Sequence, residues 1–328
     1  MFQKFRAITR LLALTLSGAI LPLAVMAQNA YPQKPIRVVV TFPPGGSADA
    51  MIRILSPRLN EKLGQQLVVE NRPGAGGNIG LAAVAKAAPD GYMLGVGAAG
   101  GLTANVSLYP QMPFDPAKEL APITMLAAIP FVIVGHPSVQ ANTVAQLIAS
   151  AKSQPGKYAI GHGGNGTAMH LSTALFSQMA DIKLTEVPYR GSGPAAMDAL
   201  SGQVPLALTD LPAALQHIKA GKLKAFAVTS PNRLASLLDV PTLAESGLTG
   251  YDSTGWFGLV APAGTPEPIL SRLHAEFTAA LNDEGIRTLM SNIGMEPVPS
   301  STEAFDTYMK SETRKWGDVI RKANIKLQ

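Results

Sequence analysis

Cysteine is absent from all 328 residues of the chain, and the excess of one charge sign is small. The absence of cysteine excludes a disulfide framework, a cysteine-ligated metal, a thiol nucleophile and a lipid-modified N-terminal cysteine. Folding therefore depends on the burial of apolar side chains, which a chain of this length can supply. The formal net charge of +5 falls close to neutral once Lys4, Arg6 and Arg10 are set aside.

Motifs for nucleic-acid binding and for catalysis are also lacking. No cluster of Lys and Arg is interleaved with aromatic residues, so we expect no nucleic-acid partner. Walker A, G-x-S-x-G and H-E-x-x-H motifs do not occur. The histidines show no paired spacing typical of metal ligands; they are His136, His162, His170, His217 and His274. We therefore expect no enzymatic activity, no metal and no cofactor, although His162 and His170 flank a turn that they can help to shape.

The first 27 residues have the pattern of a secretory signal peptide. Basic residues at the start precede an apolar stretch over 11–21, and Val25 and Ala27 fit the small-residue cleavage positions. An uncleaved membrane anchor is the alternative, but this stretch is shorter than the roughly 20 residues that span a bilayer. We expect cleavage after Ala27 and an exported, soluble product.

Short apolar runs alternate with amphipathic helical patterns along most of the chain. This βαβα rhythm predicts parallel sheets with helices on both faces, and the length favours two domains. Strands are expected at 36–42, 67–70, 93–96, 131–134, 158–161, 184–189, 204–209, 224–229 and 255–260. Helices are expected at 48–63, 78–87, 143–153 and 194–201, followed by two amphipathic helices near the end. Ser300 and Glu303 have the spacing of a capping box before the last of these.

Two glycine-rich turns each lie between an apolar strand and an amphipathic helix. The first covers residues 43–49 and the second covers residues 161–167. Such a turn bares backbone N–H groups at a helix N-terminus, where the helix dipole favours an anion. The two turns can therefore grip one small carboxylate from opposite sides. The alternative is that both turns only connect a strand to a helix.

Three further features leave alternatives open. Residues 161–166 fit G-x-G-x-x-G, with Asp181 and Glu186 downstream, but this dinucleotide motif is a weak signal in an exported chain. Asn78 is interpreted as a helix N-cap. Asp49 and Asp210 are candidate pocket carboxylates, although capping or solvated aspartates are more common.

Two other glycine-rich turns, 97–103 and 189–194, also follow strands. Pro194 suits the first turn of a helix. Arg190 can pair with an acidic ligand, although a structural salt bridge is the commoner role. Four turns rich in N–H groups, without a catalytic constellation, favour ligand capture over chemistry.

The chain resembles the Bug (TctC-like) extracytoplasmic solute receptors of tripartite tricarboxylate transporters. The resemblance lies in stretches such as Glu70-Asn71-Arg72-Pro73-Gly74, and it follows the family's order across nearly the whole exported chain. The matching stretches are 42–49, 70–77, 88–92, 187–192, 202–204, 218–223, 239–242, 256–259 and 261–266. Their combination is far more specific than any single glycine motif.

This resemblance implies a periplasmic-binding-protein-like α/β fold of two doubly wound domains with a ligand cleft between them. One domain would be residues 28–128 plus 253–328, and the other would be 129–252. It also implies a periplasmic receptor, monomeric, that presents a small carboxylate to an inner-membrane permease. In this family backbone N–H groups, small hydroxyls and water hold the carboxylate, without an arginine clamp. With the candidate Asp210, the matching binding residues are Phe42, Gly45, Gly46, Ser47, Asp49, Gly163, Asn165, Gly166, Thr167 and Ala168.

Some positions depart from the family pattern. Pro205 stands where Asp is frequent, and Leu208-Thr209-Asp210 replaces a frequent Phe-Asp-Asn. These changes leave the rest of the ligand open: an aliphatic di- or tricarboxylate, an acidic amino acid or an aromatic acid. Two other functions also stay open, a ligand-sensing input protein for a membrane kinase and a secreted enzyme that uses the same cleft.

Overall fold

The computed structural model describes residues 31–327, and the predicted signal peptide lies outside this range. From Lys34 onward the chain forms one compact unit. Among the described residues, no helix combines the length and the apolar character needed to cross a membrane.

Three parallel strands near the start of the chain form one part of the sheet, in the order β2-β1-β3. They are β1 (Ile36–Val40), β2 (Leu67–Asn71) and β3 (Met93–Ala98). Val38, Val39 and Val40 are all fully buried, as expected for a strand covered by helices on both faces. The segments that connect and follow these strands contain α2 (Ser47–Leu63), η1 (Ala75–Gly77), α3 (Asn78–Ala85), η2 (Gly100–Ala104), α4 (Asn105–Leu108) and α5 (Pro116–Glu119).

A second set of parallel strands has the order β7-β5-β6. These strands are β5 (Ala159–His162), β6 (Thr185–Pro188) and β7 (Leu206–Asp210). Four helices precede or follow them: α6 (Val144–Ser153), α7 (Ala168–Met179), α8 (Ser192–Ser201) and α9 (Leu211–Lys219). The expected βα alternation is therefore present in both parts of the sheet.

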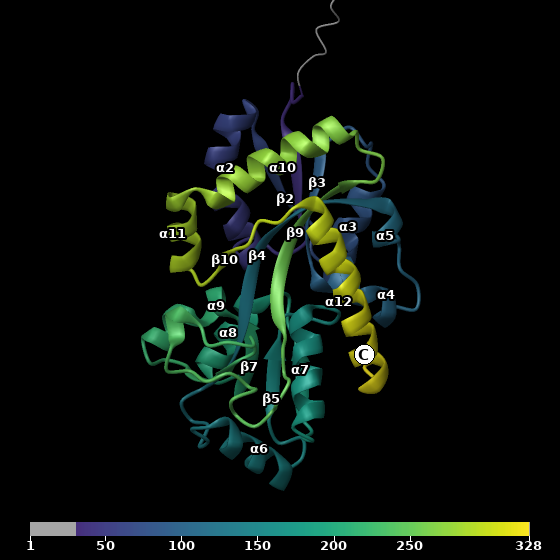
Figure 1. Ribbon diagram of the computed structural model, residues 1–328. Helices are drawn as coiled ribbons and strands as arrows, with labels where there is room; N and C mark the ends of the chain where they lie inside the picture. Colours follow the sequence, from purple (N-terminus) through teal and green to yellow (C-terminus); the bar gives the residue numbers. More distant parts are fainter. Residues whose placement is uncertain (1–30, 328) are drawn as a thin grey trace, which may run out of the picture. The chain divides into compact units, whose positions relative to one another are not determined.

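Two long strands, β4 (Leu120–Gly135) and β9 (Thr254–Pro262), lie between the two sets in the order of the sheet (Figure 1). They pair antiparallel with each other, β9 pairs antiparallel with β3, and β4 pairs antiparallel with β7 and β8 (Lys224–Val228). The prediction of purely parallel sheets is wrong for these strands. Their long, almost entirely buried sequences resemble parallel strands, because burial on both faces removes the alternation of polar and apolar residues.

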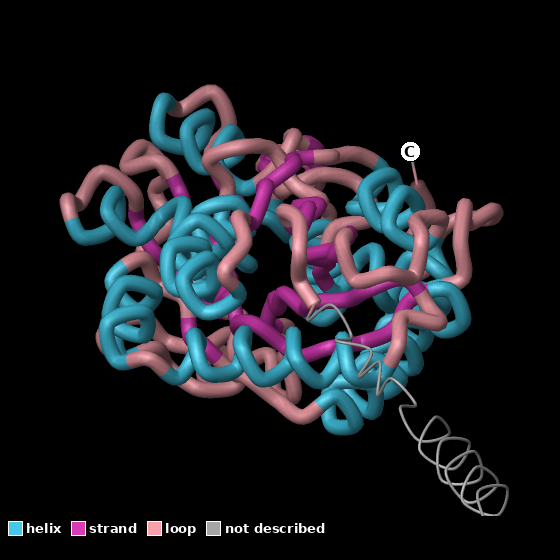
Figure 2. The backbone as a smooth tube through the Cα atoms, turned by 90° about the horizontal axis from the view of Figure 1, so that it is seen from above, coloured by secondary structure: helices cyan, strands magenta, loops and turns pink. Residues whose placement is uncertain are grey.

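The chain ends in the helices α10 (Glu267–Asn282), α11 (Glu284–Asn292) and α12 (Thr302–Lys322), with the short β10 (Glu296–Pro297) before α12. A 3-10 turn, η3 (Ala235–Leu237), lies between β8 and β9. Seen from above, most helices lie around the outside of the strands (Figure 2). In the chain, β1 leads into α2, β5 leads into α7 and β7 leads directly into α9.

Two predicted helix caps are wrong. Ser301, not Ser300, caps α12, because its side chain accepts a hydrogen bond from the Ala304 N–H. The Ser300 hydroxyl instead accepts from the backbone N–H of Met125 and so ties the segment to β4. Gly77 is the N-cap of α3, and the Asn78 side chain inside the helix accepts from Asn105 Nδ2 at 2.8 Å.

Candidate functional site

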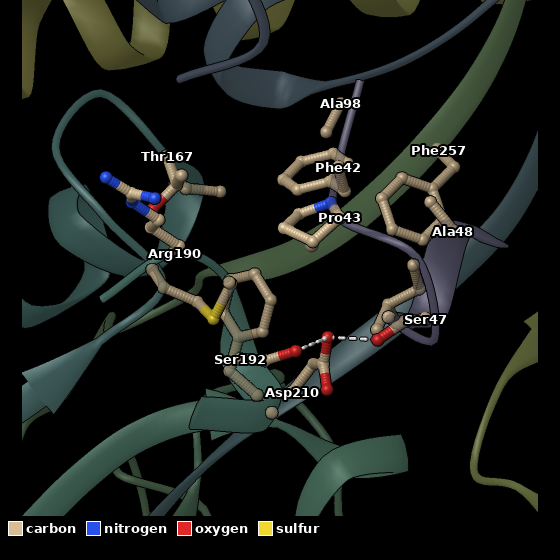
Figure 3. A pocket seen from close by; sticks show the side chains of 18 of the residues that line it. Phe42, Pro43, Ser47, Ala48, Ala98, Thr167, Arg190, Ser192, Asp210 and Phe257 are labelled. Atoms are coloured by element: carbon tan, nitrogen blue, oxygen red, sulfur yellow. Dashed lines mark hydrogen bonds between the residues drawn. The ribbon is translucent and has the colours of Figure 1, made fainter. Parts of the chain in front are cut away.

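A cavity of about 230 Å³ lies among the strand ends and helix N-termini (Figure 3). It is smaller than the roughly 300–1,000 Å³ typical of pockets for drug-sized ligands, so it suits a small molecule. Its apolar side chains include Phe42, Ile129, Phe131, Met169, Trp256 and Phe257. Its side chains with polar or charged groups are Ser47, Thr167, Arg190, Ser192 and Asp210.

The first glycine-rich turn enters the cavity at the N-terminus of α2. Gly46 is the N-cap and has no side chain to accept from the first N–H groups of the helix. Gly45, at φ +76°, donates its N–H to Asp49 at 2.9 Å, and Arg53 Nε donates to the same carboxylate at 2.9 Å. Burial alone would raise the pKa of Asp49, but the hydrogen bonds from Arg53 and Gly45 outweigh it and hold that pKa below its ordinary value. Asp49 therefore holds the turn in shape although it does not itself line the cavity.

The second glycine-rich turn enters the cavity at the N-terminus of α7. The Thr167 hydroxyl accepts from the His170 N–H at 3.3 Å and donates to the Gly164 carbonyl at 2.7 Å. His162 Nδ1 accepts from the Gly164 N–H, and His170 Nδ1 accepts from the Gly166 N–H. The two histidines thus shape this turn, as the sequence suggested.

The imidazole rings of His162 and His170 stack with their centroids 5.1 Å apart. The Nε2 atom of each ring lies 3.5 Å from Glu186 Oε2. The pKa of His170 is lowered to about 4. Burial is the largest cause, the electrostatic effect of the neighbouring His162 adds to it, and Glu186 opposes both. At neutral pH His170 is therefore an uncharged acceptor for the N–H of Gly166.

Asp210 joins the first turn to α8 and α9. Its Oδ2 accepts from Ser192 Oγ at 2.8 Å and also from Ser47 Oγ (Figure 3). Its Oδ1 accepts from the Ala213 N–H at 3.1 Å, so Asp210 is also the N-cap of α9. Burial raises the pKa of Asp210, and the three hydrogen bonds only partly offset that effect.

The structure brings most of the predicted site residues to this cavity. Seven of them line it: Phe42, Gly45, Gly46, Ser47, Thr167, Ala168 and Asp210. Gly163 and Asn165 instead line an adjoining cavity of about 460 Å³, which shares Phe42, Thr167 and Arg190 with the first. Gly166 and Asp49 line neither cavity. Contact of any of these residues with a ligand stays a prediction.

Sequence reasoning missed the apolar wall and the role of Ser192. Phe131, Trp256 and Phe257 come from β4 and β9, where they look like ordinary core residues. Ser192 stands in the turn 189–194, one of the glycine-rich turns, and Pro194 lies in the first turn of α8 as expected. That turn was the available signal, but nothing in it showed that the hydroxyl faces Asp210.

The site is suited to binding an anion. The N-termini of α2, α7 and α8 all contribute lining residues, and neither α2 nor α8 has a side-chain cap. Uncapped N–H groups and helix dipoles both favour negative charge at this point. Among the described residues, no group of His, Asp and Glu is arranged to hold a metal ion. Ser47 and Ser192 donate to a carboxylate, which is not the imidazole base of a catalytic triad.

Comparison with known proteins identifies related chains and structures. The model of the tripartite tricarboxylate transporter family receptor matches residues 51–325. Protein BugT of Bordetella pertussis is 36% identical over 306 residues, covering 93% of this chain and 94% of BugT. This chain is similar to the periplasmic binding protein BugD, with a TM-score of 0.85, 34% identity, and coverage of 91% of this chain and 100% of BugD.

A structure of Rpa4515 from R. palustris with adipate is also similar. Its TM-score is 0.87 at 34% identity, and the match covers 90% of this chain and 99% of that one. These likenesses show that the α/β fold is that of periplasmic binding proteins of the Bug/TctC type.

Proposed function

Because the chain belongs to the tripartite tricarboxylate transporter receptor family, we propose that it is a periplasmic solute-binding protein. It captures a small metabolite that carries a carboxylate and presents it to a permease of the tripartite tricarboxylate type. Proteins of this family are receptors rather than enzymes, and the similar Rpa4515 is described with adipate. We extend both properties to this chain.

One observation carries the proposal. The two glycine-rich turns are separated by more than a hundred residues, yet both reach the same small cavity. Each opens a helix of ten or more residues, so the first residues of two helices, with their backbone N–H groups, line the same space. Hydrogen bonds from such groups to a desolvated carboxylate contribute about 1.5–3 kcal/mol each. A carboxylate is the common small metabolite group that matches these donors.

Closure of two domains over the ligand is the second part of the proposal. The domains are residues 28–128 plus 253–328 and residues 129–252. This division is supported by the two separate sets of parallel strands, which β4 and β9 connect. A ligand that touches both turns stabilises the closed form by its differential affinity for that form. The permease would recognise the closed form.

Calorimetric titration of the exported chain, residues 28–328, with mono- and dicarboxylates tests the proposal. We expect at least one of these acids to bind and to remain chemically unchanged after long incubation. Binding of NAD or a sugar, with no carboxylate bound, would contradict it. Turnover of a bound acid would indicate a secreted enzyme instead.

The role after binding needs a separate experiment. We expect the ligand-loaded protein to co-purify with a membrane permease from its own cells. Co-purification with a membrane kinase alone would support the sensor alternative and would contradict the transport role. Both outcomes leave the ligand assignment unaffected.

A further inference from the structure

We propose that this receptor selects a monocarboxylate that also carries a hydrogen-bond donor, a hydroxyl or an ammonium group, which lies against Ser47, Ser192 and Asp210. The inference rests on the proposed function, since it names the ligand class of the same cavity. It also separates this chain from a receptor for dicarboxylates such as adipate.

The first step concerns the protons of the two serines. Both hydroxyls donate to Asp210 Oδ2, so both protons are already engaged. Each hydroxyl oxygen then has only lone pairs left for a ligand. Asp210 itself is an acceptor when ionised. The three side chains at this end of the cavity therefore offer acceptors and call for a donor on the ligand, whereas the backbone N–H groups at the starts of α2 and α8 are left for its carboxylate.

The second step concerns burial. Ser47, Ser192 and Asp210 are 8%, 6% and 4% exposed, so water cannot easily replace a missing partner. A site built to hydrogen-bond a donor discriminates strongly against a ligand that lacks it, because its polar groups are left unpaired. The hydrogen bonds among the three side chains also fix their positions before the ligand arrives.

The third step is the balance of charge. The first residues of α2, α7 and α8 line the cavity, and Asp210 of the lining is the N-cap of α9. Each helix N-terminus is equivalent to roughly half a positive charge. Four such ends add up to about two positive charges, and Asp210, when ionised, offsets about one of them. What remains suits one ligand carboxylate better than two.

Arg190 is the other charged residue of the lining, and it does not alter this conclusion. Its side chain is exposed, and Figure 3 shows its guanidinium pointing away from Asp210. Solvent screens a charge in that position. A second ligand carboxylate at the Asp210 end would therefore face the aspartate without a nearby cation. Two carboxylates in such contact cannot both stay ionised without a large cost.

The body of the ligand is apolar. Phe42 and Phe257 lie on the same side of the cavity with ring centroids 5.6 Å apart, and Met169 and Phe131 add further apolar surface. Between its carboxylate and its donor the ligand thus needs a hydrocarbon chain or ring. Amino acids and hydroxy acids meet this description when a hydrocarbon chain or ring separates the amino or hydroxyl group from the carboxylate.

The test is a calorimetric titration with four series of acids from butanoate to heptanoate. The far end of each acid is a methyl, a hydroxyl, an ammonium or a second carboxylate. At the chain length that binds best, we expect a hydroxyl or ammonium end to bind at least about tenfold more tightly than the carboxylate end, a difference of about 1.4 kcal/mol.

The variant Asp210→Asn should reverse this preference. Asparagine keeps an oxygen that caps α9, but it adds an N–H₂ donor and removes the negative charge. Affinity for the ammonium series should fall about tenfold or more, and affinity for the dicarboxylate series should rise. The control is Asp283→Asn, which makes the same change at the N-cap of α11, outside the cavity lining.

The outcomes separate the two proposals. If the methyl or carboxylate series binds as tightly as the donor series at every length, or if Asp210→Asn leaves the preference unchanged, the inference is wrong and the receptor function stands. If no acid of any series or of the wider carboxylate panel binds, the proposed function itself fails.

Discussion

At the scale of single residues, the hydroxyl of Thr167 has two hydrogen bonds that hold the second glycine-rich turn. It donates to the Gly164 carbonyl and accepts from the His170 N–H. The side chain also lines the cavity. One hydroxyl therefore holds the turn and caps the helix, and its residue lines the candidate cavity.

We predict that Thr167→Val weakens carboxylate binding tenfold or more, about 1.4 kcal/mol, because valine keeps the shape but loses the two hydrogen bonds that hold the turn and the start of α7 in place. Calorimetry measures the affinity, and chemical denaturation measures the loss of the cap. The matched control is Thr143→Val, which removes the hydroxyl that caps α6 away from the cavity. Similar affinities for the wild type and Thr167→Val would exclude Thr167 from the site.

The sequence predicted the turns well but not how closely they approach other segments. A Cβ added to Gly100 would lie 2.2 Å from the Gly166 carbonyl oxygen, and one added to Gly76 would lie 2.6 Å from it. Three glycines from three distant segments thus meet backbone to backbone. Each was visible as a turn residue, but only the fold shows that they need one another.

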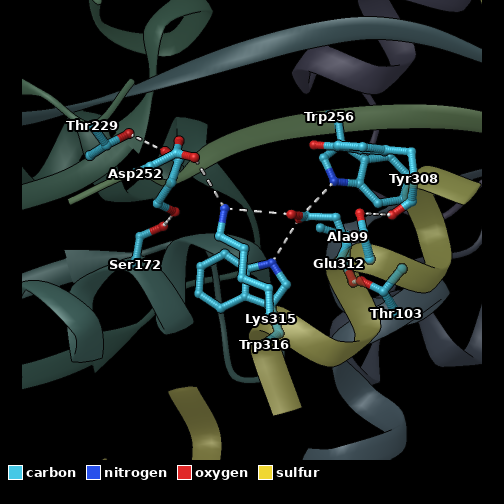
Figure 4. Close-up of polar contacts among 12 residues, drawn as sticks. Ala99, Thr103, Ser172, Thr229, Asp252, Trp256, Tyr308, Glu312, Lys315 and Trp316 are labelled. Carbon is cyan, nitrogen blue, oxygen red and sulfur yellow. Dashed lines mark hydrogen bonds and ion pairs between the residues drawn. The ribbon is translucent and has the colours of Figure 1, made fainter. Parts of the chain in front are cut away.

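At the scale of elements, α12 bonds through Glu312 to Trp256, a residue of the cavity lining (Figure 4). Glu312 is 4% exposed, and its Oε2 accepts from Trp256 Nε1 at 3.2 Å and from Trp316 Nε1 at 2.9 Å. Lys315 lies between Glu312 and Asp252, 3.5 Å and 3.4 Å from their carboxylates. Since Trp256 lines the cavity, this helix helps to orient a residue of the candidate site.

We predict that Glu312→Ala lowers the free energy of unfolding by about 2–4 kcal/mol, because it leaves two buried indole N–H groups without their acceptor. Glu312→Gln, which keeps an amide oxygen, should lose less. Chemical denaturation measures both changes. The control Glu303→Ala, at an exposed position of the same helix, should stay within about 0.5 kcal/mol of the wild type. If Glu312→Ala lowers the free energy of unfolding no more than Glu303→Ala does, this role of Glu312 is contradicted.

The helix α7 and its preceding turn should also make stability depend on pH. The folded-state pKa of His170 is about 4, below the ordinary 6.5. The unfolded chain therefore binds more protons between these values, and stability falls as the pH is lowered through that window. Above pH 6.5 this contribution is fully present. We predict a smaller loss for His170→Gln over the same range.

Denaturation curves at several pH values from about 7 to 4 measure this dependence. His136→Gln is the control, because His136 bonds to Ser138 away from the stacked pair. An equal loss of stability in the wild type and in His170→Gln would show that His170 does not titrate as expected.

Most elements could be predicted from the sequence, whereas their pairing could not. The amphipathic pattern of 305–320 is found in α12, and the expected strand 36–42 in β1. The extension of β4 back to Leu120 was missed, because Pro122 and Pro130 interrupt its apolar run. Antiparallel pairing of β4 with β9 depends on residues more than a hundred positions apart, which no local pattern records.

At the scale of the whole molecule, the hydrogen bond between Ser47 and Asp210 joins positions 163 residues apart across the candidate site. It links the N-terminus of α2 to the N-terminus of α9, so it needs the two proposed domains to be close together. A ligand bound between the two turns would favour the same closed arrangement. Loss of the ligand should allow the two glycine-rich turns to move apart. The motion would bend β4 and β9, the strands that connect the two sets of parallel strands.

We predict that a bound carboxylate makes the protein more compact and more stable. At a concentration of about 100 times its Kd, it should add about 2.7 kcal/mol to the free energy of unfolding. Small-angle X-ray scattering should show a smaller radius of gyration with ligand than without it, and Ser47→Ala should need more ligand to reach the same value. A radius unchanged by saturating ligand, together with a full rise in stability, would show that binding occurs without domain closure.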